Sequence, residues 1–225
     1  MLIIADKRIP KEAKDRLSEI GDLCLFSTEN IVYEAISGHP DIFIFQKGNS
    51  VILAPETPKY IIDKLQQYKI DITFGSSNVG EKHPQTTPYN IAYGDGVFVG
   101  NSKTTDNAIM NLSSKETWFQ SPQSYARCNT IVLDKSHIIT SEHTVASSIE
   151  DSLFINPKEV ILAGYPHGFF GGCVGFYKNK LYLLGRLKYH SQHKEILQYC
   201  NKLNIEIVEL YDGVFFDGGG VFFFD

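Results

Sequence analysis

Two cysteines stand beside groups that could activate a thiol. His167 and Cys173 are six residues apart in the glycine-rich segment 164–175, and a neighbouring imidazole raises the fraction of a thiol that is present as nucleophilic thiolate. Cys128 directly follows Arg127, whose guanidinium favours a thiolate and can also bind a carboxylate. These residues are candidates for covalent catalysis. The alternative interpretation is that both thiols are small apolar side chains of the core, as free cysteines usually are.

A second group of polar residues lies at the expected starts of strands. His39 and Asp41 are two residues apart, so a regular strand would present both on one face, where the carboxylate could orient the imidazole or hold a cationic substrate. Pro40 between them could instead place both in a loop without a role. Asn90 and Asn129 occupy comparable positions in later segments and could offer amide hydrogen bonds to a ligand.

The other histidines and cysteines do not form a metal-binding pattern. His190 and His193 are three residues apart, with no thiol or carboxylate at ligand spacing. We therefore predict no metal and no cofactor. The cysteines are widely spaced without a CxxC pair, which indicates free thiols in a reducing compartment; they are Cys24, Cys128, Cys173 and Cys200.

Composition and charge narrow the class of protein further. Of the 225 residues, 43% are hydrophobic, which is ample for a large core, and the net charge is −5, with lysines and arginines scattered singly. A nucleic-acid partner is therefore not expected. The apolar run 2–5 is too short for a signal peptide, and no apolar segment reaches 18 residues. We predict a cytoplasmic protein that does not interact with membranes.

The elements that must position these residues repeat along the chain. Four segments have two apolar strands around a short polar turn, as β-hairpins do: 41–54, 90–101, 129–140 and 173–185. Their turn centres, Asn49, Asp95, Ser136 and Asn179, follow one another at steps of 46, 41 and 43 residues. Helical spacing of apolar residues follows the hairpins, most clearly in 58–69 and 191–204. A short third strand is expected next, at 70–74, 117–119, 160–162 and 205–210. The repeating unit is ββαβ.

The two ends of the chain supply a fifth unit. Segment 2–26 has the pattern of 51–74 without the preceding strand, and 217–225 ends in a strand that could pair with residues 2–5. The sequence therefore predicts a single α/β domain, 1–225, which is a closed pseudo-fivefold propeller with one module split between the termini. A β-propeller built of four-stranded blades is disfavoured because such blades contain no helix. An open doubly wound sheet is disfavoured because it needs long crossovers rather than hairpins.

Such a ring should place the connections between modules at one end of its axis, around one pocket. These connections are 27–40, 75–88, 121–127, 164–172 and 211–219.

The repeats, together with the motifs 38-GHPD-41 and 218-GGGV-221, resemble the penteins. This superfamily includes arginine and agmatine deiminases, dimethylarginine hydrolases and amidinotransferases, and also the noncatalytic translation initiation factor six. The resemblance implies the chemistry of these enzymes, in which a cysteine attacks the guanidinium carbon, a histidine relays protons and acidic residues bind the cation.

The chain departs from the enzymes at their nucleophile. They continue the terminal glycine turn into a histidine or arginine and then a cysteine, whereas this chain has Phe222 and Phe223. Their H-x-D motif lies in a middle module, and here it falls in the first complete one. Any catalytic set would therefore combine Cys173 or Cys128 with His167, or with His39 and Asp41.

Two functions follow from this resemblance, and the sequence does not establish catalysis. The first is binding of a small cationic or amino-acid-like ligand in an axial pocket, with cysteine-dependent hydrolysis of an amidino or amide C–N bond. The second is a noncatalytic module that binds a protein or the ribosome, with an exposed aromatic patch as its interface: Phe169, Phe170, Phe215 and Phe216.

Overall fold

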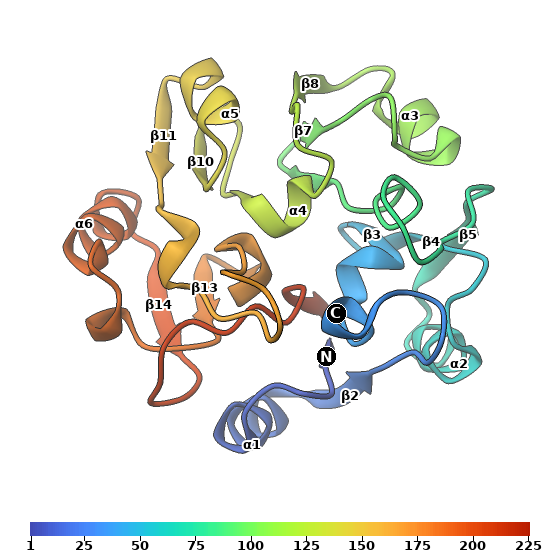
Figure 1. Cartoon of the computed structure of the whole chain (residues 1–225), viewed down its shortest axis with the longest axis horizontal. Helices are drawn as coiled ribbons and strands as arrows, with labels where there is room; N and C mark the ends of the chain where they lie inside the picture. The colour runs from blue at the N-terminus through green and yellow to red at the C-terminus, as the bar shows by residue number, and fades with distance from the viewer.

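A computed structural model describes all residues, 1–225, and contains five three-stranded sheets (Figure 1). In each sheet the middle strand pairs antiparallel with the first strand and parallel with the third, with the helix of the module between the second and third strands. This is the predicted ββαβ unit.

The five modules have these bounds. The split module contains β15 (Val221–Phe224), β1 (Leu2–Asp6), α1 (Lys11–Ile20) and β2 (Asp22–Phe26). The next contains β3 (Ile44–Lys47), β4 (Ser50–Leu53), α2 (Lys59–Gln67) and β5 (Asp71–Phe74). The third contains β6 (Ala92–Gly94), β7 (Val97–Gly100), α3 (Asn107–Ser113) and β8 (Thr117–Gln120). The fourth contains β9 (Thr130–Val132), β10 (His137–Thr140), α5 (His143–Ser148) and β11 (Asp151–Phe154). The last contains β12 (Val174–Tyr177), β13 (Lys180–Leu183), α6 (His193–Lys202) and β14 (Glu206–Glu209).

The split module forms as the sequence predicts. β15 pairs antiparallel with β1, from Leu2 opposite Phe224 to Ala5 opposite Val221. Every residue of β15 is buried, and alternate residues enter different hydrophobic clusters: Phe222 and Phe224 pack on one side, Val221 and Phe223 on the other. A strand buried on both faces has no polar positions, which explains the uninterrupted apolar run.

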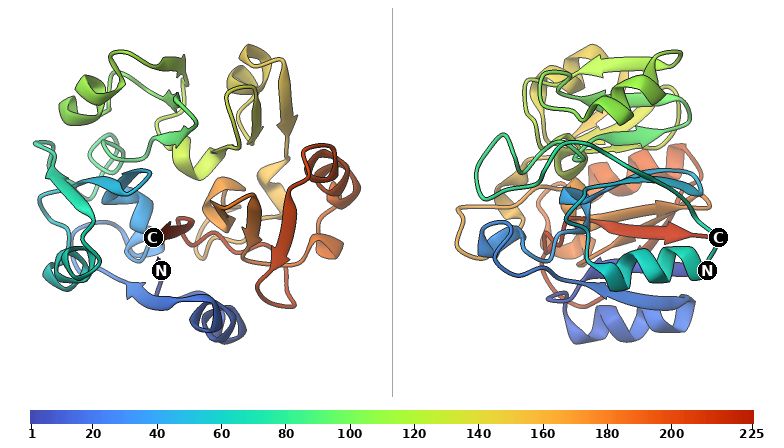
Figure 2. Two further views of the ribbon diagram at one scale, coloured as in Figure 1. Left: turned by 180° about the vertical axis from the view of Figure 1, so that it is seen from behind. Right: turned by 90° about the vertical axis from the view of Figure 1, so that its right-hand side faces the viewer.

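The sheets lie around a common centre, with their first strands inside and the helices outside (Figure 1). β12 contacts β15, and β6 contacts β9. Both termini lie at one end of the molecule, and the connecting segments 27–40, 75–88 and 164–172 project from the opposite end (Figure 2). No helix is long and apolar enough to cross a bilayer.

The hairpin turns use the residues that their backbone requires. Lys178 and Asn179 both have positive φ, as do Asp95 and Gly96, the combination typical of two-residue type I′ turns. At Ser136 the φ is not positive. There the Asp134 carboxylate accepts a 2.8 Å hydrogen bond from the Ser136 amide and closes the turn instead.

The third strand of the fourth module differs from the sequence-based prediction. It is β11, Asp151–Phe154, rather than 160–162. The helix α5 has only six residues, and the chain is extended again at Ile149, so the strand forms earlier than expected. Residues Pro157–Glu159 form a 3-10 turn, and Ile161 makes only an isolated bridge with Phe216.

Three of the predicted strand starts are short helical turns instead. We call them pre-strand turns: η2 (Pro40–Ile42), α4 (Ala126–Asn129) and η4 (Gly171–Cys173). Each precedes the first strand of a module and lies on the central side of it (Figure 1). They carry most of the candidate residues, so the chemistry of the centre depends on them.

Asp106 joins the connecting segment 75–88 to the start of α3. Its carboxylate accepts hydrogen bonds from the backbone N–H groups of Ser76, Ser77 and Ala108 at 2.7–2.9 Å. Burial alone would raise the pKa of Asp106, but these hydrogen bonds and that of the Ser77 hydroxyl outweigh it and leave the pKa below 3.8.

We therefore expect Asp106→Asn to lower the free energy of unfolding by about 1–3 kcal/mol at pH 7. A depressed folded pKa stabilises the protein above the unfolded value of 3.8, and this stabilisation is lost as the pH falls through the folded value. The free energies of unfolding of the wild type and of Asp106→Asn, measured with urea, should therefore become equal as the pH falls below 4. Asp95→Asn, in an exposed turn that suits asparagine, is the matched control. A constant difference at all pH values would contradict this account.

Candidate functional site

The pre-strand turns bring polar side chains from distant parts of the sequence to the centre of the molecule. η2 supplies Asp41, preceded by His39, and α4 supplies Arg127 and Cys128. Asn90 comes from the segment before β6. We call these five residues, with Asp6 and Asp217, the central polar cluster. All are buried except Arg127, which is partly buried.

Cys128 is held by two neighbours. Its thiol donates a hydrogen bond of 2.9 Å to Oδ2 of Asp41, and Nδ2 of Asn90 lies 3.3 Å from Sγ. The side-chain oxygen of Asn90 accepts from the backbone N–H groups of Arg127 and Cys128 at 2.9 and 3.2 Å, which fixes the start of α4. Cys128 is therefore positioned by Asp41 and Asn90 together.

His39 lies next to this pair without a hydrogen bond of its own. One ring nitrogen of His39, one oxygen of Asp41 and the sulfur of Cys128 all lie within 4.8 Å of one another. Nδ1 of His39 is 3.9 Å from Asp217, and Nε2 is 4.0 Å from Asp6. Both nitrogens and Oδ1 of Asp41 are buried without a hydrogen-bond partner, which is rare for buried polar atoms.

Burial governs the charges of the cluster. It raises the pKa of Asp41 to about 6, against the opposing charge of Arg127, and it also raises the pKa of Asp217. Burial raises the pKa of the Cys128 thiol well above its usual value, and the charges of Asp41 and Asp217 add to this effect. Burial likewise lowers the pKa of His39, although Asp217 and Asp6 oppose it. At pH 7 the thiol is protonated and the imidazole neutral.

Arg127 connects three modules. Its guanidinium donates to the carbonyl of Gly171 at 2.7 Å and to that of Val174 at 3.0 Å, and it lies over the ring of Phe222 at 5.4 Å from the ring centroid. It is also the one residue of the cluster that lines a cavity of about 790 Å³ among the hairpins.

The glycine turn before β15 packs directly on the cluster. Gly219 has a φ of +66°, and a Cβ there would lie 2.5 Å from Cβ of His39 and 2.7 Å from Oδ1 of Asp41. Its amide donates a 3.1 Å hydrogen bond to Asp217. A side chain at this position would be strained and would also collide with the site, so glycine is required.

Other candidates do not join the cluster. The side chain of Asn129 donates to the Tyr125 carbonyl at 2.8 Å and completes α4. Cys173 is buried, with its sulfur 3.4 Å from the Phe169 carbonyl, and burial raises its pKa well above the usual value. His167 directs Nδ1 to the Gly168 carbonyl at 2.8 Å, and no hydrogen bond joins it to Cys173. The expected His167–Cys173 pair does not form, because the η4 turn directs the thiol into the core.

Sequence reasoning missed Asp6 and Asp217. Asp6 ends β1 and forms a bidentate pair with Arg8, and Asp217 accepts from the amides of Phe169 and Gly219. The available signal was their position: Asp6 is the last residue of β1 and Asp217 precedes the glycine turn, both at the junction of the split module.

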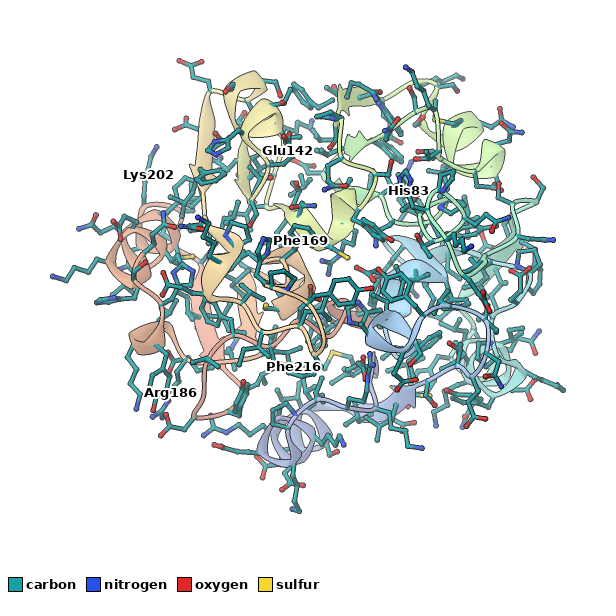
Figure 3. The ribbon with its side chains drawn as sticks, in the orientation of Figure 1. His83, Glu142, Phe169, Arg186, Lys202 and Phe216 are labelled. Carbon is teal, nitrogen blue, oxygen red and sulfur yellow. The ribbon has the colours of Figure 1, made fainter.

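The pocket and the aromatic patch also differ from expectation. A cavity of about 790 Å³ lies among the hairpins, at the end of the molecule opposite the connecting segments, and is lined by Tyr93, Tyr177, Phe223 and others. Phe170 and Phe215 are buried and pack together at 5.6 Å between ring centroids, so the four phenylalanines form no exposed patch. Phe169 lies near the centre of the view in Figure 3.

Three solved structures have a fold similar to that of this chain. DDAH from Pseudomonas aeruginosa, a cysteine-to-serine mutant complexed with citrulline, has a TM-score of 0.55 and 9% identity, over 92% of this chain and 91% of that one. The agmatine deiminase of C. jejuni has a TM-score of 0.54 and 13% identity, over 93% and 74% of the two chains. An amidinotransferase from Microseira wollei has a TM-score of 0.51 and 9% identity, over 92% and 87%.

The fold is therefore that of the penteins, as the repeats and the glycine motif indicate. No curated protein is detectably similar to the chain in sequence. The chain belongs to DUF6873, a family of unknown function, whose profile matches residues 4–222.

Proposed function

We propose that the five modules form a closed pentein ring whose central polar cluster binds a small cationic group, and that Cys128 attacks an amidino or amide carbon of that ligand to cleave a C–N bond. The observation that carries this proposal is the contact of the Cys128 thiol with Asp41 at 2.9 Å, with His39 beside both.

The charges of the cluster support a cationic ligand. Three buried carboxylates, Asp6, Asp41 and Asp217, surround His39. Arg8 neutralises Asp6, and Arg127 is the one other guanidinium within reach. A guanidinium or amidinium ligand would compensate the remaining negative charge. The similar DDAH structure contains citrulline, and a C. jejuni agmatine deiminase structure contains its substrate.

The same ligand would activate the thiol. A cation next to Cys128 stabilises the thiolate, and the raised pKa of Asp41, about 6, makes this carboxylate an acceptor for the thiol proton. The sulfur then forms a bond to the amidino carbon, the C–N bond breaks and the departing amine takes up a proton from the His39–Asp41 pair. Water hydrolyses the resulting thioester-like adduct and restores the thiol. Residues around the cluster must move for a ligand to enter, since His39 and Cys128 are only 1% and 3% exposed.

The test is turnover of arginine, agmatine and methylated arginines in the presence of a chelator, measured as the ureido product or released amine. We expect Cys128→Ala to lose roughly 10³-fold or more of the activity, and Cys173→Ala, which removes another buried thiol from a pre-strand turn, to retain it. The proposal is wrong if Cys128→Ala retains activity, or if none of these compounds is turned over or raises the melting temperature.

A noncatalytic binding module is the second candidate. The observation that favours it is a hollow of about 300 Å³ beside exposed Ile161, Tyr165 and Val214. On this reading the wild type co-sediments with ribosomal subunits, and Tyr165→Asp does not. Equal sedimentation of the two proteins, or none by either, would exclude it.

A further inference from the structure

We propose that His39, Asp41 and Cys128 also form a binding site for Zn²⁺. One potential ligand atom from each residue lies within 4.8 Å of those of the other two, and all three residues are buried. The sequence did not indicate such a site, because Cys128 is 87 residues from Asp41 and belongs to another module.

The strongest support comes from buried polar atoms that have no hydrogen-bond partner. Both ring nitrogens of His39 and Oδ1 of Asp41 are fully buried without a hydrogen-bond partner. Because an imidazole nitrogen and a carboxylate oxygen are good zinc ligands, a metal ion would satisfy atoms that no group of the protein reaches.

The surroundings of His39 suit a metal ligand equally well. A histidine that binds zinc usually donates its other N–H to a carboxylate, which orients the ring. Here Asp217 lies 3.9 Å from Nδ1 and Asp6 lies 4.0 Å from Nε2. Whichever nitrogen binds the metal, the other therefore faces a carboxylate, and a small rotation of the ring would complete that hydrogen bond.

Charge balance favours a divalent ion. Asp6 is neutralised by Arg8, and Arg127 opposes Asp41 and Asp217. When zinc binds, the Cys128 thiol loses its proton to solvent, and the sulfur–zinc bond replaces the hydrogen bond to Asp41. The carboxylates of Asp41 and Asp217, the Cys128 thiolate and the Arg127 guanidinium together carry a net charge of minus two. One Zn²⁺ ion cancels this charge.

The mixture of ligands favours zinc over other metals. One sulfur, one nitrogen and one oxygen suit a borderline ion, whereas Ca²⁺ and Mg²⁺ prefer oxygen ligands alone. Three protein ligands leave the fourth tetrahedral position free. This inference uses the residues of the proposed function, and a zinc-bound thiolate would not attack substrate. Zinc binding is therefore measured in the absence of substrate, and hydrolysis is measured in the presence of a chelator. Either the zinc site or the hydrolytic function can then be disproved without affecting the other.

The experiment is titration of chelator-treated protein with Co²⁺, which reports a thiolate ligand as a charge-transfer absorption band in the near ultraviolet. We expect one equivalent to bind the wild type with this band, and Zn²⁺ to displace it and raise the melting temperature. Cys128→Ser should lose the band, and His39→Gln should weaken binding by at least about tenfold. Cys173→Ser is the matched control and should keep both the absorption band and the metal affinity.

Two results would overturn the proposal: no saturable binding by the wild type, or a band that persists in Cys128→Ser. If Cys128→Ser does not fold, X-ray absorption of the zinc-loaded wild type replaces it. One sulfur in the zinc shell supports the proposal, and a shell without sulfur refutes it.

Discussion

Replacing Arg127 by alanine should lower the free energy of unfolding by about 3–5 kcal/mol, since it leaves buried carboxylates without their countercharge. The guanidinium opposes the charge of Asp41 and donates to the carbonyls of Gly171 and Val174. Without it the pKa of Asp41 should rise further. Urea unfolding at pH 7 measures the change.

Arg186→Ala is the control for this substitution. Arg186 pairs with Glu209 and Asp212 at the surface, where an ion pair contributes about 1 kcal/mol or less. Arg127→Lys keeps the charge but cannot reproduce the planar guanidinium, so it should lie between wild type and alanine. If Arg127→Ala is no more destabilising than Arg186→Ala, the guanidinium is not the countercharge of the cluster.

Phe223→Ala should cost about 3–5 kcal/mol of unfolding free energy, the range for truncating a buried phenylalanine. Phe223 is 4% exposed, stacks on Tyr177 at 5.3 Å between ring centroids and lies 4.5 Å from the ring of Tyr182. The substitution opens a void between the split module and its neighbour.

Phe74→Ala is the matched control, because Phe74 is also a strand phenylalanine but is 50% exposed. Its effect should stay within about 0.5 kcal/mol. Thermal and urea unfolding of both variants measure the contrast. Similar losses for the two would mean that β15 contributes little to the core.

The repeated architecture could be predicted from the sequence because its signals are local. Turn residues and alternating apolar residues identify each hairpin within about a dozen positions, and the terminal segments complete the pattern. The pre-strand turns could not be predicted in this way. Pro40 and the Gly171–Gly172 pair permit both a strand start and a helical turn, and packing at the centre selects the turn.

The central residues were only partly predictable, for a similar reason. The sequence identified Asp41, Asn90 and Cys128 as separate candidates, and the structure brings them into contact. Proximity in sequence suggested the His167–Cys173 pair, which the direction of η4 does not allow. Asp6 and Asp217 were missed because His39, the cluster residue that both approach, lies far from each of them along the chain.

The split module has a consequence for how the protein is made. Between the synthesis of β1 and that of its partner β15 the ribosome adds more than 200 residues, roughly 10–45 s of translation. Throughout this interval one edge of β1 has no strand beside it, and Asp217 and the glycine turn are missing from the centre. The other modules can assemble as they emerge, but the polar centre cannot be complete until Asp217 and the glycine turn have been synthesised.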